Sequence, residues 1–124
     1  MNEKIGEFSS EVISLLNLNI PVGTGIFIGE TNIAHMLKTH PYEFHLFFDQ
    51  LSYIISNADF VRLRVNDNSI EFIKEFGKYI KLAVRIAGDG KYYARSLYFI
   101  ETNRVENLLK TKKLKQLTKR GFGV

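Results

Sequence analysis

The stretch that decides the fold is YIKLAVRIAGDGKYYARSLYFI, residues 79–100. Apolar and polar residues alternate on both sides of Gly88-Asp89-Gly90, which is typical of two β-strands, and Asp-Gly favours a tight hairpin turn. A two-residue loop at Asp89 and Gly90 gives the hairpin one mostly apolar face and one polar face. The apolar pairs are then Ile86 with Tyr93, Val84 with Arg95, Leu82 with Leu97 and Ile80 with Phe99.

The polar face of this hairpin carries the hydroxyl and cationic side chains. Its pairs are Lys81 with Tyr98, Ala83 with Ser96 and Arg85 with Ala94. A four-residue loop would keep this division between the faces. A three-residue loop would reverse it and turn Arg85, Ser96 and Tyr98 toward the core, because side chains alternate along a strand.

The remaining pattern predicts an α+β fold, with helices packed on a four- to five-stranded, mainly antiparallel sheet. The stretch 69–76 predicts the second arm of a hairpin with 60–65, although its apolar spacing also fits one or two helical turns. Helices are expected over about 3–17, from the cap Thr31 to Thr39, over 41–56 and from the cap Asn103 loosely to Leu117, with one more strand over 23–29 and a frayed end at 121–124.

Length and composition indicate one domain over residues 1–124. The chain has 45% hydrophobic residues, 10 Phe and 6 Tyr, enough for one core, and no Cys for disulfides or thiolate metal sites. It contains no apolar run long enough to span a bilayer, so we expect a soluble protein without membrane contact. The expected location is the cytoplasm, either directly or after delivery as part of a larger toxin or a phage particle. The formal charge of +4 favours a polyanionic partner, whereas the Lys-rich segment 110–120 is as readily a solvated helix face.

His40 stands at a predicted helix boundary. Pro41 disfavours the α region for the residue before it, so one helix should end near Thr39, and Pro41 with Glu43 suits the start of the next. His40 would then be the N-cap of the second helix. Its side chain could either cap free amides or serve a site, and the residues alone do not decide between these roles.

Residues 26–117 resemble the phage-associated branch of the Barnase, EndoU, colicin and RelE-like nucleases. The resemblance rests on the helix ending Ile33-Ala-His-Met-Leu-Lys-Thr-His-Pro41, the amphipathic helix after it, the meander of strands, and the late strand 95–99 before the last helix. The segment 1–20, read as an N-terminal helix, lies outside it. Such proteins are small toxins or phage-borne domains that cut RNA without a metal, so the resemblance implies a BECR-fold ribonuclease.

By this resemblance His40 is the leading catalytic candidate and Ser96 its companion, at a position where the family commonly has Thr. Arg85 and Tyr98 are further catalytic candidates because they share the predicted face of Ser96. His35 turns away from the apolar stripe of its helix and is either solvated or a second catalytic member. Lys81, Arg62, Arg64 and Tyr92 are candidates for binding RNA through phosphate contacts and base stacking, although each would also be an ordinary strand residue.

Metal-free RNA cleavage needs a base for the 2′-hydroxyl, an acid for the leaving 5′-oxygen, and cations or donors for the charge on the phosphate oxygens of the phosphorane-like transition state. Histidine suits both proton transfers because it changes charge near neutral pH. His35, His40 and His45 are spaced unfavourably for a metal site, since Pro41 separates them, and we predict no metal and no cofactor.

The sequence therefore predicts a toxin-like, metal-independent endoribonuclease that leaves a 2′,3′-cyclic phosphate. Its expected partners are RNA, with tRNA among the candidate targets, and a cognate immunity or antitoxin protein. The main alternative is a non-catalytic module that binds RNA or a protein through the same basic, tyrosine-rich sheet. A structural phage protein is a third interpretation.

Overall fold

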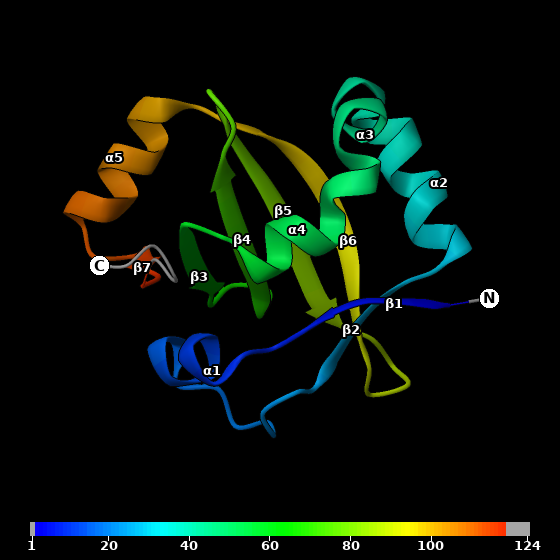
Figure 1. The fold of residues 1–124 in the computed structure, drawn as a ribbon, viewed down its shortest axis with the longest axis horizontal. Coiled ribbons are helices and arrows are strands. Elements are labelled where there is room, and N and C mark those ends of the chain that lie inside the picture. The colour runs from blue at the N-terminus through cyan, green and yellow to red at the C-terminus, as the bar shows by residue number, and fades with distance from the viewer. Residues whose placement is uncertain (1, 119–124) are drawn as a thin grey trace, which may run out of the picture.

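The computed structural model describes residues 2–118 and confirms the α+β class (Figure 1). A mainly antiparallel sheet has the strand order β1-β2-β6-β5-β4-β3-β7, in which β2 and β6 form the parallel pair. It has seven strands where four or five were predicted, because β1 and β7 add to its edges. The strands are β1 (Glu3–Glu7), β2 (Gly25–Ile28), β3 (Phe60–Arg64), β4 (Ser69–Glu75), β5 (Tyr79–Ile86), β6 (Tyr92–Ile100) and β7 (Lys115–Gln116).

The N-terminal helix is shorter than predicted. Residues 3–7 form β1, which pairs antiparallel with β2, and α1 is confined to Ser10–Leu16. Ser9 begins α1, because its Oγ accepts the Val12 amide at 3.2 Å. Gly6 lets β1 approach the next layer, since a Cβ there would lie 2.9 Å from the Ile55 side chain. The apolar spacing over 3–17 indicated a helix, but it does not distinguish a helix from an edge strand. Ile5 on β1 and Phe8 just after it are both buried without being helical.

The second of the two predicted middle helices is broken, whereas the break between the two helices at His40 is as predicted. α2 (Glu30–Thr39) begins after the N-cap Gly29, earlier than the predicted cap Thr31, and His40 separates it from α3 (Pro41–Phe47) as predicted. The expected helix over 41–56 is interrupted by a 3₁₀ turn, η1 (Phe48–Gln50), before α4 (Leu51–Ser56). The break lets α3 lie against β6 while α4 packs on β1, β4 and β5, which a straight helix could not reach (Figure 1).

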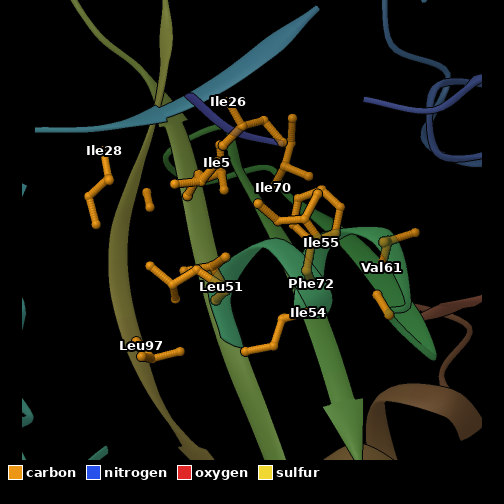
Figure 2. Close-up of a cluster of buried hydrophobic side chains, with 14 of the residues drawn as sticks. Ile5, Ile26, Ile28, Leu51, Ile54, Ile55, Val61, Ile70, Phe72 and Leu97 are labelled. Carbon is orange, nitrogen blue, oxygen red and sulfur yellow. The ribbon is translucent and has the colours of Figure 1, made fainter. Parts of the chain in front are cut away.

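The main hydrophobic core lies between the sheet and α4. Figure 2 shows Leu51, Ile54 and Ile55 of α4 among strand residues such as Phe72 and Leu97. A smaller cluster on the opposite face packs Ile73 and Ile100 against Val105 and Leu108 of α5 (Thr102–Lys110) and against Leu114, which follows the helix. Within residues 2–118, no helix is long and apolar enough to cross a membrane.

The C-terminal segment also departs from the prediction. α5 begins after the N-cap Glu101, not Asn103, and it ends at Lys110 without continuing to Leu117. Lys112 has a left-handed backbone conformation, and the chain then forms β7 along the free edge of β3. A strand in place of further helix pairs the backbone groups along the edge of β3. Leu114 is buried in this arrangement as well. The predicted frayed end at 121–124 lies outside the described residues.

The hairpins over 60–76 and 79–100 are confirmed, with one change of register in the second. Far from its turn, the pairing is as predicted, with Lys81 opposite Tyr98, Leu82 opposite Leu97 and Ala83 opposite Ser96. Near the turn it is shifted by one residue, so that Val84 faces Ala94, Arg85 faces Tyr93 and Ile86 faces Tyr92. Arg95 is left unpaired at the shift and forms a β-bulge.

This bulge compensates for the loop. The loop has three residues, because the Ala87 amide donates to the Lys91 carbonyl at 2.8 Å, and Gly90 adopts φ +83° within it. The two-residue loop was therefore a wrong prediction, and a three-residue loop was expected to turn the polar side chains inward. The extra residue at Arg95 shifts the register back, so the predicted division of faces survives beyond it.

Candidate nuclease site

The polar face of the sheet holds a small cavity that gathers most of the predicted site residues. It has a volume of about 140 Å³ and lies between α2 and the strands β4, β5 and β6. His35, Arg64, Arg85, Ser96 and Tyr98 were predicted and line it. Its other lining residues are Asp67, Ser69, Glu71, Ala83 and Arg95, none of which the sequence singled out.

His40 lies beside this cavity and contacts it through Tyr98. The His40 ring stacks on the Tyr98 ring with centroids 4.8 Å apart and planes 18° from parallel. Its Nδ1 is 3.7 Å from Oε2 of Glu43, and the same oxygen accepts the Phe99 amide at 3.4 Å. His40 is the N-cap of α3, as predicted, but its side chain makes no capping hydrogen bond. The imidazole is thus held by contacts of the site rather than by the helix end.

A buried charge cluster forms the floor beneath Tyr98. Glu71 is 1% exposed, and its carboxylate lies 3.1 Å from Lys81 Nζ and 3.4 Å from Arg62 Nη1. The Lys81 ammonium also lies 4.6 Å from the centroid of the Tyr98 ring, a cation–π distance. Lys81 and Arg62 were predicted to contact RNA, whereas the structure directs both toward Glu71 inside the protein.

Cations line the open side of the cavity. Arg85 Nη1 lies 3.7 Å from Asp67 Oδ2, and Arg64 lines the same wall. The Ser69 hydroxyl and amide hydrogen bonds, together with Arg64 and Arg85, hold the pKa of Asp67 below its usual value. Arg95 is exposed on its bulge and forms no ion pair with any acid among residues 2–118. The rim therefore has three guanidinium groups, of which one is balanced by Asp67.

Tyr92 is the predicted site residue that the structure does not bring to this face. It points into the main core, where its ring meets Phe8 edge-on at 4.9 Å. The register shift is the cause, because it places Tyr93 and not Tyr92 beside Arg85. His45 is exposed on α3.

Of the five lining residues that the sequence did not single out, Arg95 and Glu71 were missed for identifiable reasons. Arg95 was assigned to the apolar face, because a bulge leaves no trace in an alternating pattern. Glu71 was overlooked although it stands alone among the apolar residues Ile70, Phe72 and Ile73. A single acid inside an apolar strand indicates that its carboxylate is buried with a cationic partner. Over residues 2–118, no three His, Asp or Glu side chains are grouped so that they could hold a metal ion.

The fold and this site define the class of protein. A mainly antiparallel α+β domain with imidazole, hydroxyl and guanidinium groups around one cavity suits a phosphate-containing substrate. Comparison with known families gives a match to the family described as phage-Barnase-EndoU-ColicinE5/D-RelE like nuclease3, over residues 3–107. The chain belongs to this family of nucleases of the BECR type.

The match also places β1 inside the family fold. It begins at residue 3, whereas the resemblance in the sequence was placed at 26–117. No curated protein and no solved structure matches the chain.

Proposed function

We propose that this nuclease is a metal-independent endoribonuclease that cleaves RNA by attack of a 2′-hydroxyl on the adjacent phosphorus. One observation carries the proposal: His35, Arg64, Arg85, Arg95, Ser96 and Tyr98 converge on a single cavity, with His40 stacked on Tyr98 beside it. These are the groups that such a reaction needs without help from a metal.

The two histidines supply the proton transfers. One takes the proton of the 2′-hydroxyl as the 2′-oxygen bonds to phosphorus, and the other protonates the 5′-oxygen as its bond to phosphorus breaks. The products are a 2′,3′-cyclic phosphate and a free 5′-hydroxyl. Glu43 beside Nδ1 of His40 orients the ring, leaves Nε2 for the substrate and stabilises the imidazolium when it forms.

The arginines and hydroxyls stabilise the charge that develops on the phosphate oxygens. Arg85 and Arg95 can each offer a planar fork of N–H donors, which matches the geometry of a phosphate. The hydroxyls of Ser96 and Tyr98 add neutral donors from the cavity wall. Buried Lys81 acts through its contact with Tyr98 and not on the RNA itself.

The reaction is tested by incubating the purified protein with total RNA in excess EDTA. We expect fragments whose 3′ ends carry a cyclic phosphate, detected because they resist 3′-end ligation until the phosphate is removed. Intact RNA together with salt-sensitive binding would contradict the proposal and favour a non-catalytic RNA-binding module.

The histidine roles are tested by substitution. His40→Ala and His35→Ala should each lower kcat by about a hundredfold to ten-thousandfold, the usual contribution of a positioned acid or base. His45→Ala is the matched control, because His45 is exposed on α3 away from the cavity and should leave kcat unchanged. Full activity in a folded His40→Ala protein would remove His40 from the catalytic set.

A further inference from the structure

A second cavity, which we call the basic groove, lies at the sheet edge where α1, β3 and the turn between α5 and β7 meet (Figure 1). It has a volume of about 430 Å³, within the usual range for ligand sites. Its cationic lining residues are Arg62, Arg64, Lys112, Lys113 and Lys115. The other lining residues are apolar or carry side-chain amides, and within residues 2–118 no Asp or Glu lines the groove.

Most of the positive charge of the basic groove is not neutralised. The Arg62 guanidinium lies 3.4 Å from the buried Glu71 carboxylate, so this cation is already balanced. The exposed cations of the groove that form no ion pair with an acid among residues 2–118 are Arg64, Lys112, Lys113 and Lys115. A polyanion in the groove therefore meets four cations without first displacing an internal partner.

The lysines of the groove stand on an ordered turn. The Lys113 amide donates to the Leu108 carbonyl at 2.8 Å, and the left-handed conformation of Lys112, with φ 62°, reverses the chain after α5. Leu114 is buried in the smaller core cluster, and Lys115 pairs with β3. The neighbours of Leu114 are therefore held at the surface, because adjacent side chains of an extended chain point in opposite directions.

Arg64 connects the basic groove with the small polar cavity of the candidate site, since it lines both. At the far side of that cavity Arg95 stands on β6, which is three interstrand spacings from β3, or roughly 14 Å. The cations thus continue from β6 across the sheet to its β7 edge. A ligand that contacts all of them must be a chain with negative charges repeated along its length.

We propose that the basic groove binds the phosphate backbone of the single-stranded RNA that flanks the cleaved bond. The inference rests on the proposed ribonuclease function. Positively charged grooves that follow the backbone are the usual means of holding a single strand without reading its sequence. A strand held in the small cavity is carried past Arg64 into the groove, which favours RNA over an acidic protein as the occupant.

The basic groove also extends beyond the part of the chain that the family match covers. That match ends at residue 107, whereas Lys112, Lys113 and Lys115 follow it. These lysines are therefore features of this chain in addition to the matched fold. They lengthen the surface that contacts RNA and add affinity for substrates longer than a dinucleotide.

The binding test uses a 2′-O-methyl oligonucleotide of about 12 nucleotides, within the site sizes of such grooves, which cannot be cleaved because it lacks the 2′-hydroxyl. Fluorescence anisotropy over a series of KCl concentrations gives the affinity and its salt dependence. Lys113→Gln/Lys115→Gln should weaken binding roughly tenfold at physiological salt and reduce the slope of log K against log salt by about 1.4, or about 0.7 per lost phosphate contact.

The matched control is Arg104→Gln/Lys110→Gln. Both residues are exposed on α5 and line neither cavity, and the substitutions remove the same charge. This variant should keep the affinity and the slope of the unsubstituted protein. Equal losses in the two variants would overturn the proposal, because net charge alone would then explain them. Unchanged RNA binding in the groove variant would also overturn it and leave the groove to an acidic protein.

A second measurement does not depend on any variant. Amide NMR spectra of the unsubstituted protein titrated with the same oligonucleotide should shift at Lys112 and Lys113, which line the basic groove alone. A 2′-O-methyl dinucleotide should shift only residues of the small cavity, since it is too short to pass Arg64. Shifts confined to the small cavity with the long oligonucleotide would contradict the proposal.

Cleavage kinetics separate failure of this inference from failure of the proposed function. The expected result is a higher KM for long RNA in the groove variant than in the α5 variant. RNA cleaved with the same KM by both variants would refute the groove and leave the ribonuclease. Binding that depends on Lys113 and Lys115, in a protein that leaves RNA uncut, would refute the ribonuclease and leave the groove.

Discussion

The two faces of the β5–β6 hairpin differ in what they contact, although they are built from alternate residues of the same strands. One face is buried in the core and the other lines a cavity. On one face Ile80, Leu82 and Val84 are fully buried in the main core. On the other, Arg85, Ser96 and Tyr98 line the small polar cavity beside α2. Core residues and site residues therefore alternate along the chain. A one-residue shift of register that no bulge compensates would exchange the two faces.

The need for strict alternation of core and site residues differs between the two strands. β5 is regular and keeps strict alternation, whereas β6 contains the bulge at Arg95 and so absorbs the odd residue of the loop. An alternating pattern is thus indispensable on β5 but locally relaxed on β6. This difference between neighbouring strands can be tested directly.

The largest effect is expected from a single-residue deletion in β5, compared with a deletion at the bulge of β6. Deleting Ala83 from β5 would bring Lys81 to the core and turn Leu82 out, so we expect a loss of about 5 kcal/mol or more, comparable to the total stability of a domain. Deleting Arg95 only makes β6 regular, because Ala94 and Ser96 keep their partners, and the protein should stay folded. Urea denaturation measures both, and equal losses of stability would show that the bulge is not the compensating device.

The next largest effect concerns the charge cluster under the polar face. Glu71→Gln leaves Lys81 buried without its anion, and breaking a buried ion pair in this way costs about 3–5 kcal/mol. Glu75→Gln, at an exposed position on the same strand, should change stability by less than about 0.5 kcal/mol. A small loss for Glu71→Gln would mean that Lys81 reaches solvent or another acid.

A third pair compares the faces at adjacent ladder positions. Leu82→Ala should lower the unfolding free energy by about 2–5 kcal/mol because it leaves a cavity in the core, with cleavage retained in the folded fraction. Ser96→Ala should affect mainly the reaction. Its unfolding free energy should fall by no more than about 1 kcal/mol, while kcat should fall clearly. Denaturation and kinetics on the same samples separate the two, and a Ser96→Ala protein with full kcat would exclude Ser96 from the reaction.

The smallest effect is a pH dependence at the cavity wall. Because the pKa of Asp67 is lowered in the folded protein, its ionised form contributes stability above the usual value of 3.8, and this contribution disappears as the pH falls through the lowered pKa. The Tm of Asp67→Asn should therefore lie a few degrees below that of the unsubstituted protein at pH 7. The gap should begin to close as the pH falls below about 4 and vanish below the lowered pKa, and a gap independent of pH would assign the effect to another contact.

Local patterns were sufficient for much of the fold and for part of the site. The helix break at His40 follows from Pro41, because proline restricts the residue before it whatever the surroundings. The hairpins follow from alternation, whereas Ser96 and Tyr98 keep the predicted side of the sheet because the bulge at Arg95 offsets the three-residue loop. The strand at residues 3–7 could not be predicted in this way, since five residues with one buried side chain fit a helix or an edge strand equally well.

The sequence by itself thus determined the α+β class, the alternation of faces along β5 and the isolation of His40 between two helices, because these depend on neighbouring residues alone. Only the tertiary structure decided that His40 stacks on Tyr98, that Lys81 and Arg62 turn to Glu71, and that Arg95 bulges toward the cavity. Each of these contacts joins separate elements of the fold. Their geometry depends on how the whole sheet pairs and packs, which no local pattern encodes.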